Sequence, residues 1–415
     1  MVNFERFVLS NGLRLLFHPD PTTPMATVCI TYNTGTKNED PDKTGFAHLF
    51  EHLMFSGSKN APNFDDIIQN AGGENNAFTN QDMTVYYDIV PLDNLETAIW
   101  IEADRMQNLK LTQKSLNRER KVVVEEFKET CVDEPYGDIW HHIGPLLYKD
   151  HPYSVPTIGK EISHIENAVL ADIESFYRNF YCPSNAIVTV SANISAPEVY
   201  KLVEKYFGEI PAGNPRLGKI PEERKQATPR SLTVESKVPT PAIFMIFHSA
   251  ARKTDEYYHD EVLSDILGEG EASLIYKKLV KEKEIFSEAD VYITGTIDPG
   301  LFILEGKLNE QISFETAERA LWEMLEELKS KPLAEKELLR LQNRIEHNLE
   351  FAEVTAFHKA VNLGYYELLG NAAWINEEGT KYHNISVKDL QSRALELFDP
   401  NKVSTIYYRS NDAKR

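Results

Sequence analysis

The hydrophobic and polar positions of this chain follow two periods, one typical of strands and one typical of helices. Runs rich in β-branched and aromatic residues predict strands, and apolar residues three and four apart predict amphipathic helices. The predicted strands are 24–33, 83–91, 185–192, 241–248, 289–295 and 301–308. The predicted helices are 92–107, 113–130, 195–208, 254–267, 313–330 and 333–350. This mixture predicts the α+β class, with mostly antiparallel sheets covered by helices.

The pattern of the first half recurs in the second half at a constant distance. Each half contains a proline before an apolar strand-like run, and each contains a later helix, proline stop and strand. The same offset separates the members of three matched pairs, which are Pro24 and Pro241, Asp172 and Asp389, and Pro183 and Pro400. A constant offset at widely separated points indicates an internal duplication.

The duplication predicts two homologous domains, residues 1–212 and residues 231–415. A chain of 415 residues, of which 42% are hydrophobic, exceeds one ordinary domain and suffices for two cores. The segment between them, 213–230, is rich in proline, glycine and charge and lacks apolar periodicity. We expect this segment to be the linker.

The stretch 44–57, TGFAHLFEHLMFSG, predicts a short helix with a group of metal-binding side chains. Thr44 is the predicted N-cap. His48 and His52 lie one turn apart on one face, with Glu51 beside them. Two neutral imidazoles at this spacing bind zinc, and an adjacent carboxylate takes a proton from water on the metal. Ordinary solvated side chains on an exposed helix are the alternative interpretation.

The second copy helps to choose between these interpretations. Shifting the three positions by the offset of the repeat leads to Asp265, Gly268 and Glu269. The second copy therefore has a helical segment there but lacks the histidines. A trio that folding itself required would be expected in both copies, so its presence in one copy favours a chemical role.

Composition and charge narrow the classes of function. The formal net charge of −20 opposes binding to a phosphate backbone, which excludes a nucleic-acid role. No run approaches 18 consecutive apolar residues, so we expect no membrane insertion. The three cysteines, Cys29, Cys131 and Cys182, are well separated and form no C-x-x-C pair. We expect a cytoplasmic protein with reduced thiols, although a removed signal peptide would leave no trace.

A third metal ligand is expected from a second helix packed against the histidines. The segment 111–130 is charged and helical, and such a charge run is typical of a solvated face. Glu119 and Glu126, however, are seven residues apart, so they share a face with Val122 and could both point inward. Glu125 and Glu129 are further carboxylates on this helix.

These motifs resemble the pitrilysin or insulinase-type zinc metallopeptidases, in particular their two-domain members such as the subunits of mitochondrial processing peptidase. The family pattern is H-x-x-E-H followed at a characteristic distance by a glutamate, matched here by His48, Glu51 and His52 and then by Glu126. The second family motif, E-R-x-x-V-x-x-E, is matched by ERKVVVEE at 119–126.

The resemblance implies a zinc endopeptidase with one ion per chain. It implies His48, His52 and Glu126 as metal ligands, Glu51 as the catalytic proton acceptor and donor, and Glu119 as a residue that orients the ligands. It also implies an edge strand that pairs with extended peptide substrate, formed by Asn76, Ala77, Phe78 and Thr79.

The second half departs from the family pattern. Active members commonly carry an arginine and a tyrosine in a segment resembling L-x-R-E-K-x-x-x-A-Y, which bind and polarise substrate. Here Lys281 stands where arginine is expected, and Ser287 lies near the expected tyrosine. The resemblance therefore implies a homologous partner subunit that supplies arginine and tyrosine, with a homodimer as the alternative.

A second function class is a non-catalytic assembly subunit, because the family fold also occurs as a scaffold in larger complexes. The intact set of metal-binding residues favours the peptidase over the scaffold. Neither the physiological peptide nor the cleavage-site preference follows from the sequence.

Overall fold

The computed structural model describes residues 1–331 and 333–411, which form two compact units. Unit 1 comprises Met1–Thr130, His151–Pro221 and Glu350–Glu377. Unit 2 comprises Cys131–Asp150, Glu222–Leu349 and Glu378–Arg415, as far as it is described. One crossing between the units, at Pro221 and Glu222, lies inside the expected linker, and residues 211–229 form no helix or strand. The boundaries of the two homologous domains themselves stay a prediction.

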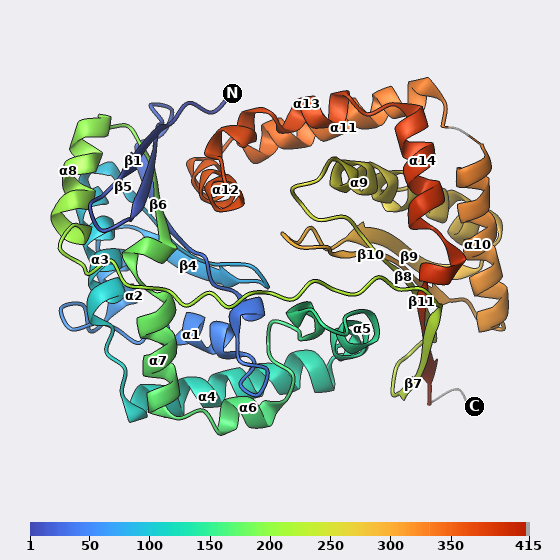
Figure 1. The fold of residues 1–415 in the computed structure, drawn as a ribbon, viewed down its shortest axis with the longest axis horizontal. Helices are drawn as coiled ribbons and strands as arrows, with labels where there is room; N and C mark the ends of the chain where they lie inside the picture. Colours follow the sequence, from blue (N-terminus) through green and yellow to red (C-terminus); the bar gives the residue numbers. More distant parts are fainter. Residues whose placement is uncertain (332, 412–415) are drawn as a thin grey trace. The chain divides into compact units, whose positions relative to one another are not determined.

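Unit 1 is built on a six-stranded sheet (Figure 1). Its strand order is β1-β2-β6-β3-β5-β4, and only the β2–β6 pair is parallel. The strands are β1 Glu5–Val8, β2 Arg14–Pro19, β3 Met25–Tyr32, β4 Glu74–Thr79, β5 Thr84–Pro91 and β6 Ala186–Ala192. The helices are α1 Phe46–Met54, α2 Phe64–Asn70, α3 Leu95–Asn108, α4 Gln113–Phe127, α6 Ile162–Glu166, α7 Leu170–Phe180, α8 Ala196–Phe207 and α12 Ala356–Leu369.

Unit 2 repeats this topology with five strands. Its order is β7-β11-β8-β10-β9, again with one parallel pair, β7–β11. The strands are β7 Arg230–Ser236, β8 Ala242–His248, β9 Phe286–Ile293, β10 Leu301–Leu308 and β11 Ser404–Ser410. The helices are α5 Ile139–Leu147, α9 Asp255–Gly268, α10 Phe314–Ser330, α11 Glu335–Ala352 (in this unit as far as Leu349), α13 Glu378–His383 and α14 Val387–Leu397.

The α+β class is confirmed, and the internal repeat is visible in the elements themselves. Strands β5 and β10 begin and end at positions related by the offset of the repeat, and so do helices α7 and α14. Every predicted strand and helix is present, with ends that differ by three residues at most. The hydrophobic pattern located these elements well because each buries at least one face, and β3, β6 and β8 are buried along almost their whole length.

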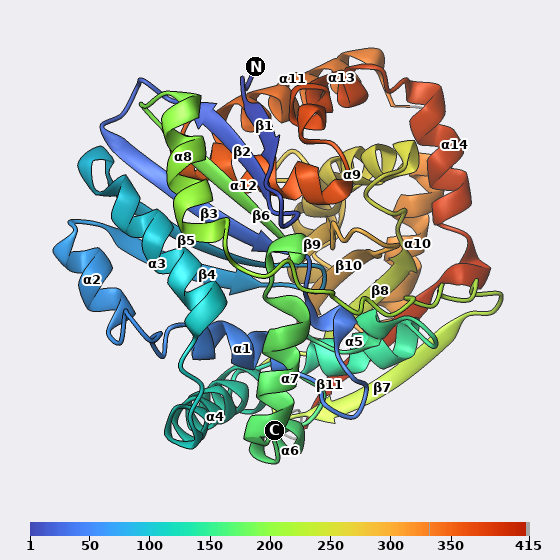
Figure 2. The ribbon, with the colours of Figure 1, turned by 60° about the vertical axis from the view of Figure 1, so that its left-hand side comes forward.

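The two units exchange a pair of equivalent helices. Helices α5 and α12 begin at equivalent positions of the repeat, yet α5 of the first half belongs to unit 2 and α12 of the second half belongs to unit 1. Figures 1 and 2 show α12 beside the strands of unit 1, where it packs against β3 and β6. A division of the chain at the linker alone therefore does not describe the compact units.

Helix α12 approaches the sheet of unit 1 closely at a glycine. A Cβ atom at Gly364 would lie 2.6 Å from Thr31 Oγ1, so only glycine allows this approach. Glu367, which is buried, accepts hydrogen bonds from Arg6 at 2.9 and 3.1 Å. A side-chain charge near the chain start thus holds a helix from the second half in unit 1.

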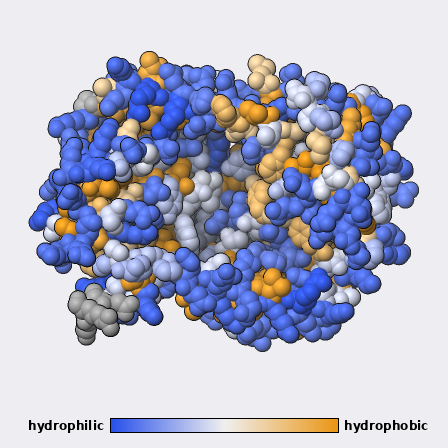
Figure 3. All heavy atoms as spheres, turned by 180° about the vertical axis from the view of Figure 1, so that it is seen from behind, coloured by the Kyte–Doolittle hydropathy of each residue, from blue (hydrophilic) through white to orange (hydrophobic). Residues whose placement is uncertain are grey.

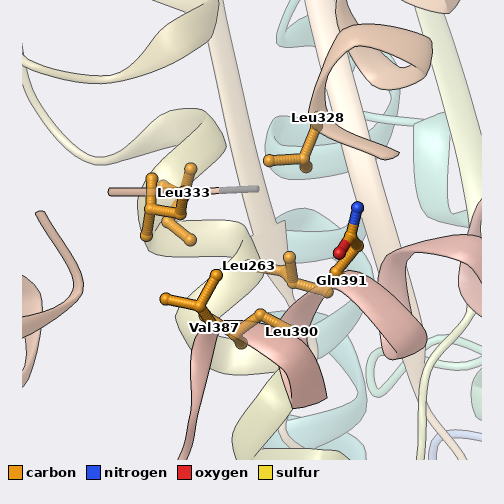
Figure 4. A pocket seen from close by; sticks show the side chains of 7 residues that line it. Leu263, Leu328, Leu333, Val387, Leu390 and Gln391 are labelled. Carbon is orange, nitrogen blue, oxygen red and sulfur yellow. The ribbon is translucent and has the colours of Figure 1, made fainter. Parts of the chain in front are cut away.

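The face of the molecule drawn in Figure 3 is polar, and unit 2 contains a small gap among side chains of α9, α10, α14 and the segment between α10 and α11. That face is covered mainly by hydrophilic residues, and every described helix is too short or too polar to cross a bilayer. The gap has a volume of about 10 Å³, room for roughly one water molecule. Figure 4 shows the side chains that line it, which are Leu263, Ile266, Leu328, Leu333, Val387, Leu390 and Gln391.

A charged cluster lies inside the core of unit 1. Asp88 on β5 and Glu102 and Arg105 on α3 are all 1% exposed or less. Arg105 Nε donates to Glu102 at 2.8 Å, and the Arg105 guanidinium lies 4.4 Å from the ring centres of Phe64 and Tyr86. Burial raises the pKa of Asp88 well above its usual range, and the charge of Glu102 adds to this rise. The cluster thus contains one guanidinium and two carboxyl groups, and its burial favours the protonated form of Asp88.

A proton kept on Asp88 in the fold would make the stability of the protein depend on pH. The unfolded chain releases it near the ordinary aspartate pKa, whereas the folded chain retains it, so stability falls as pH rises above about 4. Asp88→Asn removes this dependence. We expect its free energy of unfolding to exceed that of the wild type by a margin that grows from pH 5 to pH 8 in urea titrations. The exposed Asp66→Asn should show no such margin, and parallel curves for Asp88→Asn and wild type would show that Asp88 is ionised in the fold.

Candidate metal centre

Helix α1 presents the predicted histidines, but its N-terminus is built differently from the prediction. Gly45, not Thr44, is the N-cap residue, and it adopts a left-handed φ of 83°. The Thr44 hydroxyl instead accepts the N–H of Lys160 at 2.8 Å and lies 2.9 Å from His164 Nδ1. The N–H groups of Gly45 and Ala47 donate to Glu39, a residue that the sequence did not point to because it precedes the first helical residue by seven positions.

The apolar residues of α1 are buried, which fixes the direction of its polar face. Phe46, Ala47, Leu49, Phe50, Leu53 and Met54 are at most 4% exposed. His48, Glu51 and His52 are partly exposed at one edge of this buried surface. Burial of the remaining side chains therefore leaves these three residues able to address a common point.

Helix α4 packs against α1 and brings Glu126 to the two histidines. Its buried side includes Leu116, Val123 and Val124, whereas Val122 is 45% exposed. The prediction that Val122 shares an inward face with the glutamates was wrong, because Val122 lies about 100° behind Val123 on the helix and so falls outside the apolar stripe. Glu126 lies at the edge of that stripe, half-exposed.

The three side chains converge closely enough for one metal ion to bind them all. His48 Nε2 lies 3.5 Å from Glu126 Oε1, and His52 Nε2 lies 3.4 Å from Glu126 Oε2. The ligand atoms of all three residues lie within 4.8 Å of one another. Zinc with bonds of about 2.0–2.2 Å and tetrahedral angles places its ligand atoms roughly 3.3–3.6 Å apart. The two histidine-to-carboxylate distances match this spacing, and the donor set of two imidazoles and one carboxylate fits zinc in chemistry.

The electrostatics of the site favour the ligand forms of two of these groups. Burial lowers the pKa of His48, which keeps its imidazole neutral, as a metal ligand must be. The hydrogen bond with His52 lowers the pKa of Glu126, which keeps its carboxylate ionised. For His52, burial lowers the pKa but the Glu126 hydrogen bond and nearby carboxylates raise it overall. Burial raises the pKa of Glu51, whereas the Thr79 hydroxyl and His52 act to lower it.

Glu119 lies on the far side of His52 from Glu126. Its Oε2 is 4.0 Å from His52 Nδ1, and its Oε1 accepts a hydrogen bond from Arg118 Nε at 2.6 Å. His52 is thus flanked by a carboxylate at each ring nitrogen, a position suited to orienting the ring. His48 Nδ1 is buried and has no hydrogen-bond partner among the described residues.

The predicted substrate strand is the outer strand of the unit 1 sheet. In the described part of the chain β4 pairs with β5 alone, with Asn76 opposite Tyr87 and Thr79 opposite Thr84. The N–H of Ala77 donates to the side chain of Asn76 at 2.8 Å. Asn76 is exposed, and Ala77, Phe78 and Thr79 are partly exposed. Strand β4 also packs against α1, which places this edge next to the helix with the histidines.

Lys281 and Ser287 belong to unit 2. Lys281 is exposed in a π-helical segment, Tyr276–Glu282, and its ammonium lies 5.3 Å from the centre of the Tyr276 ring. Ser287 is exposed on β9, where its hydroxyl donates to the carbonyl of Lys307 at 3.3 Å. Neither side chain has the planar guanidinium or the phenol that the family pattern expects.

The counterpart of the histidine site in unit 2 is organised around a guanidinium. Asp265 and Glu269 stand at the positions of the repeat equivalent to His48 and His52, on and just after α9. Arg344 on α11 donates to Asp265 Oδ2 at 2.7 Å and lies 3.9 Å from Glu269 Oε1. The second copy therefore lacks the histidines, as predicted from its sequence, and its carboxylates face a cation that belongs to the chain itself.

Comparison with known proteins agrees with this site. Residues 14–151 match the family model described as Insulinase (Peptidase family M16), and residues 167–345 match the one described as Peptidase M16 inactive domain. The chain is 28% identical over 415 residues to a zinc protease, PqqE, of Helicobacter pylori, covering 98% of this chain and 92% of that protein. It is 30% identical over 209 residues to a probable mitochondrial-processing peptidase subunit beta of Schizosaccharomyces pombe, covering 50% of this chain and 45% of that one.

A solved structure of similar architecture extends over the whole chain. The crystal structure of a protease from Helicobacter pylori superposes with a TM-score of 0.92 at 27% identity, covering 99% of this chain and 100% of that one. The chain belongs to the M16 family, the pitrilysin and insulinase-type peptidases. Its relatives include proteins named zinc proteases, which supports the peptidase class and zinc as the metal.

The geometry predicts different roles in zinc binding for two neighbouring glutamates of α4. Glu126 faces both histidines, whereas Glu125 is exposed and accepts from Lys128 Nζ at 2.7 Å. We expect Glu126→Ala to lose most of its bound zinc, because two histidines alone hold the ion weakly, and Glu125→Ala to retain it. Elemental analysis of both purified variants checks this, and the opposite result would move the third ligand to Glu125.

Proposed function

We propose that this chain is a zinc-dependent endopeptidase that hydrolyses extended peptides at a site formed by α1, α4 and β4. The observation that carries the proposal is the position of Glu126, whose two carboxylate oxygens lie 3.5 Å from His48 Nε2 and 3.4 Å from His52 Nε2. Membership of a family whose relatives are named zinc proteases supports it.

In the proposed site His48, His52 and Glu126 hold one zinc ion. When bound, zinc lowers the pKa of a water molecule and polarises a carbonyl oxygen. Glu51 directly precedes His52 on α1. It accepts the proton from the attacking water and delivers it to the leaving amine. Glu119 holds the orientation of His52 from the opposite side of the ring. No covalent bond between substrate and protein is needed.

The substrate is proposed to add to the edge of β4 as a further strand. The N–H of Ala77 is occupied by the Asn76 side chain, which a peptide carbonyl could replace. Main-chain hydrogen bonds of this kind select extended chains over folded proteins, because only an extended chain offers its backbone along its length. Asn76, Ala77, Phe78 and Thr79 form this proposed substrate edge.

The peptidase is further proposed to act with a partner. Lys281 and Ser287 replace an arginine and a tyrosine that stabilise negative charge developing on the scissile carbonyl in other members. A homologous subunit that carries these two residues would complete the site, and a second copy of this chain is the alternative. A non-catalytic scaffold of the same fold would require neither the metal nor the partner's residues.

The first test concerns proton transfer. Glu51→Gln keeps the size of the side chain but cannot accept a proton, so kcat for peptide hydrolysis is expected to fall by about 10²- to 10⁴-fold. Zinc content, measured by elemental analysis, should stay at one ion per chain. Turnover close to that of the wild type at full zinc occupancy would reject this role for Glu51.

The second test concerns the partner. The purified chain alone should bind zinc but cleave an unstructured basic peptide slowly. Addition of a homologous chain with the arginine and tyrosine, and without H-x-x-E-H, is expected to raise kcat/KM about 10²-fold or more and to co-elute at a 1:1 ratio. Full activity of a monomer of this chain, independent of concentration, would remove the need for a partner.

A further inference from the structure

The first turn of α1 has no cap of its own. Its N-cap residue, Gly45, contributes no side chain, and no larger residue fits there. A Cβ atom at Gly45 would lie 2.7 Å from the carbonyl oxygen of Ile158 and 2.9 Å from Ile165 Cδ1, in addition to the strain of a φ of 83°. The preceding hydroxyl, on Thr44, is engaged by Lys160 and His164. The unpaired N–H groups at this helix start must therefore be satisfied from elsewhere in the chain.

The Glu39 side chain supplies the missing acceptors. Its Oε2 accepts the N–H of Gly45 at 2.8 Å, and its Oε1 accepts the N–H of Ala47 at 2.6 Å. One carboxyl group thus spans the N-cap and the second residue of the helix. Burial raises the pKa of Glu39 to about 8, whereas the helix N–H groups act to lower it. Ala47 immediately precedes His48, so the hydrogen bond acts on the turn that positions the first histidine.

Glu39 is itself tied to the loop that follows the proposed substrate edge. It terminates a short 3-10 turn, Thr36–Asn38, with its N–H bonded to the carbonyl of Thr36 at 3.2 Å. The N–H groups of Thr36 and Lys37 donate to the carbonyls of Asn80 and Gln81 at 3.2 and 3.0 Å. These two residues directly follow β4. A continuous set of hydrogen bonds therefore runs from the end of β4 through Glu39 to the start of α1.

We propose that Glu39 is a positioning residue that fixes the first turn of α1, and with it His48 and Glu51, relative to the edge strand β4. The inference rests on the proposed function, since it assigns this contact a role in metal affinity and turnover. Glu39 does not touch the metal-binding side chains in any described contact and acts only through the helix backbone. Loss of its acceptors would let the first turn fray and would misplace His48 while the buried side of α1 stays packed.

The test compares Glu39→Ala with a cap removed at a distant helix. The control is Ser195→Ala, which breaks the capping box that Ser195 and Glu198 form at α8. Both variants lose a helix cap, so both are expected to unfold at a lower temperature. Only Glu39→Ala is expected to bind zinc more weakly, by about 10- to 100-fold in competition with a chelator. At saturating zinc its kcat should fall with little change in KM, because the ligands and the base move rather than the substrate edge.

A conservative variant and a metal-free measurement keep the test decisive. Glu39→Gln retains one acceptor oxygen and is expected to recover part of the zinc affinity. This variant can replace Glu39→Ala in the test if Glu39→Ala folds poorly. In the metal-free protein, amide exchange at residues 45–49 should be faster in Glu39→Ala than in the wild type. Wild-type zinc affinity and kcat in Glu39→Ala, with only the unfolding temperature lowered, would reduce Glu39 to a simple cap and overturn the inference. A wild-type chain that binds no zinc would instead reject the proposed function, whatever the exchange rates show.

Discussion

The packing of α1 against α4 is the contact on which the rest of the site depends. Each helix carries one part of the metal-binding set, and neither part holds an ion firmly alone. The buried residues of both helices, among them Leu49, Leu53, Leu116 and Val123, belong to one hydrophobic core. This apolar contact sets the rotation of each helix, and the rotation brings the edge residues His48, His52 and Glu126 to within a few ångströms of a common point.

Unit 2 contains the equivalent pair of helices, α9 and α11, without the metal-binding histidines. The five strands of unit 2 follow the order of β2 to β4 in unit 1, without a counterpart of β1 among the described residues, and helix α9 bears Asp265 where α1 bears His48. There the facing helix contributes Arg344, whose guanidinium pairs with the carboxylate directly. A cation from the chain satisfies the acidic groups permanently, whereas the histidines of unit 1 leave a place for an exchangeable ion. The same scaffold thus holds a structural ion pair in one copy and a candidate catalytic site in the other.

Hydrogen bonds and packing link the metal-binding helix α1 to the proposed substrate edge, β4. Strand β4 and helix α1 are in contact, and Glu39 links the loop after β4 to the first turn of α1. Peptide hydrolysis requires the scissile bond and the attacking water to be held in a narrow range of positions. A hydrogen-bonded path between the two elements restricts their relative movement without placing any additional group in the site.

The class of fold, the repeat and most elements could be predicted from the sequence, because the hydrophobic pattern records which residues of each helix or strand are buried. It also determined the residue types of the metal site, since H-x-x-E-H places its three side chains on one turn of one helix. The choice of Glu126 over Glu125 and Glu129 as the ligand rests on family resemblance, because spacing along the helix alone does not say which side faces α1. Val122 and Val123 are both apolar, so the sequence does not say which of them is buried. Packing against α1 buries Val123 and leaves Val122 exposed.

Contacts between residues far apart in the sequence could be seen only in the folded structure. The exchange of α5 and α12 between the units left no local signal, because an apolar face indicates that a helix is buried but not which sheet it packs against. Glu39 carried no signal either, since its partners are backbone N–H groups, which every sequence possesses, and the helix start it caps was expected to use Thr44. Thr44 lost that role because His164 and Lys160 reach its hydroxyl and Ile158 excludes a side chain at position 45. Local sequence specifies what each segment prefers, and these outcomes depend on which distant groups compete for the same atoms once the chain has folded.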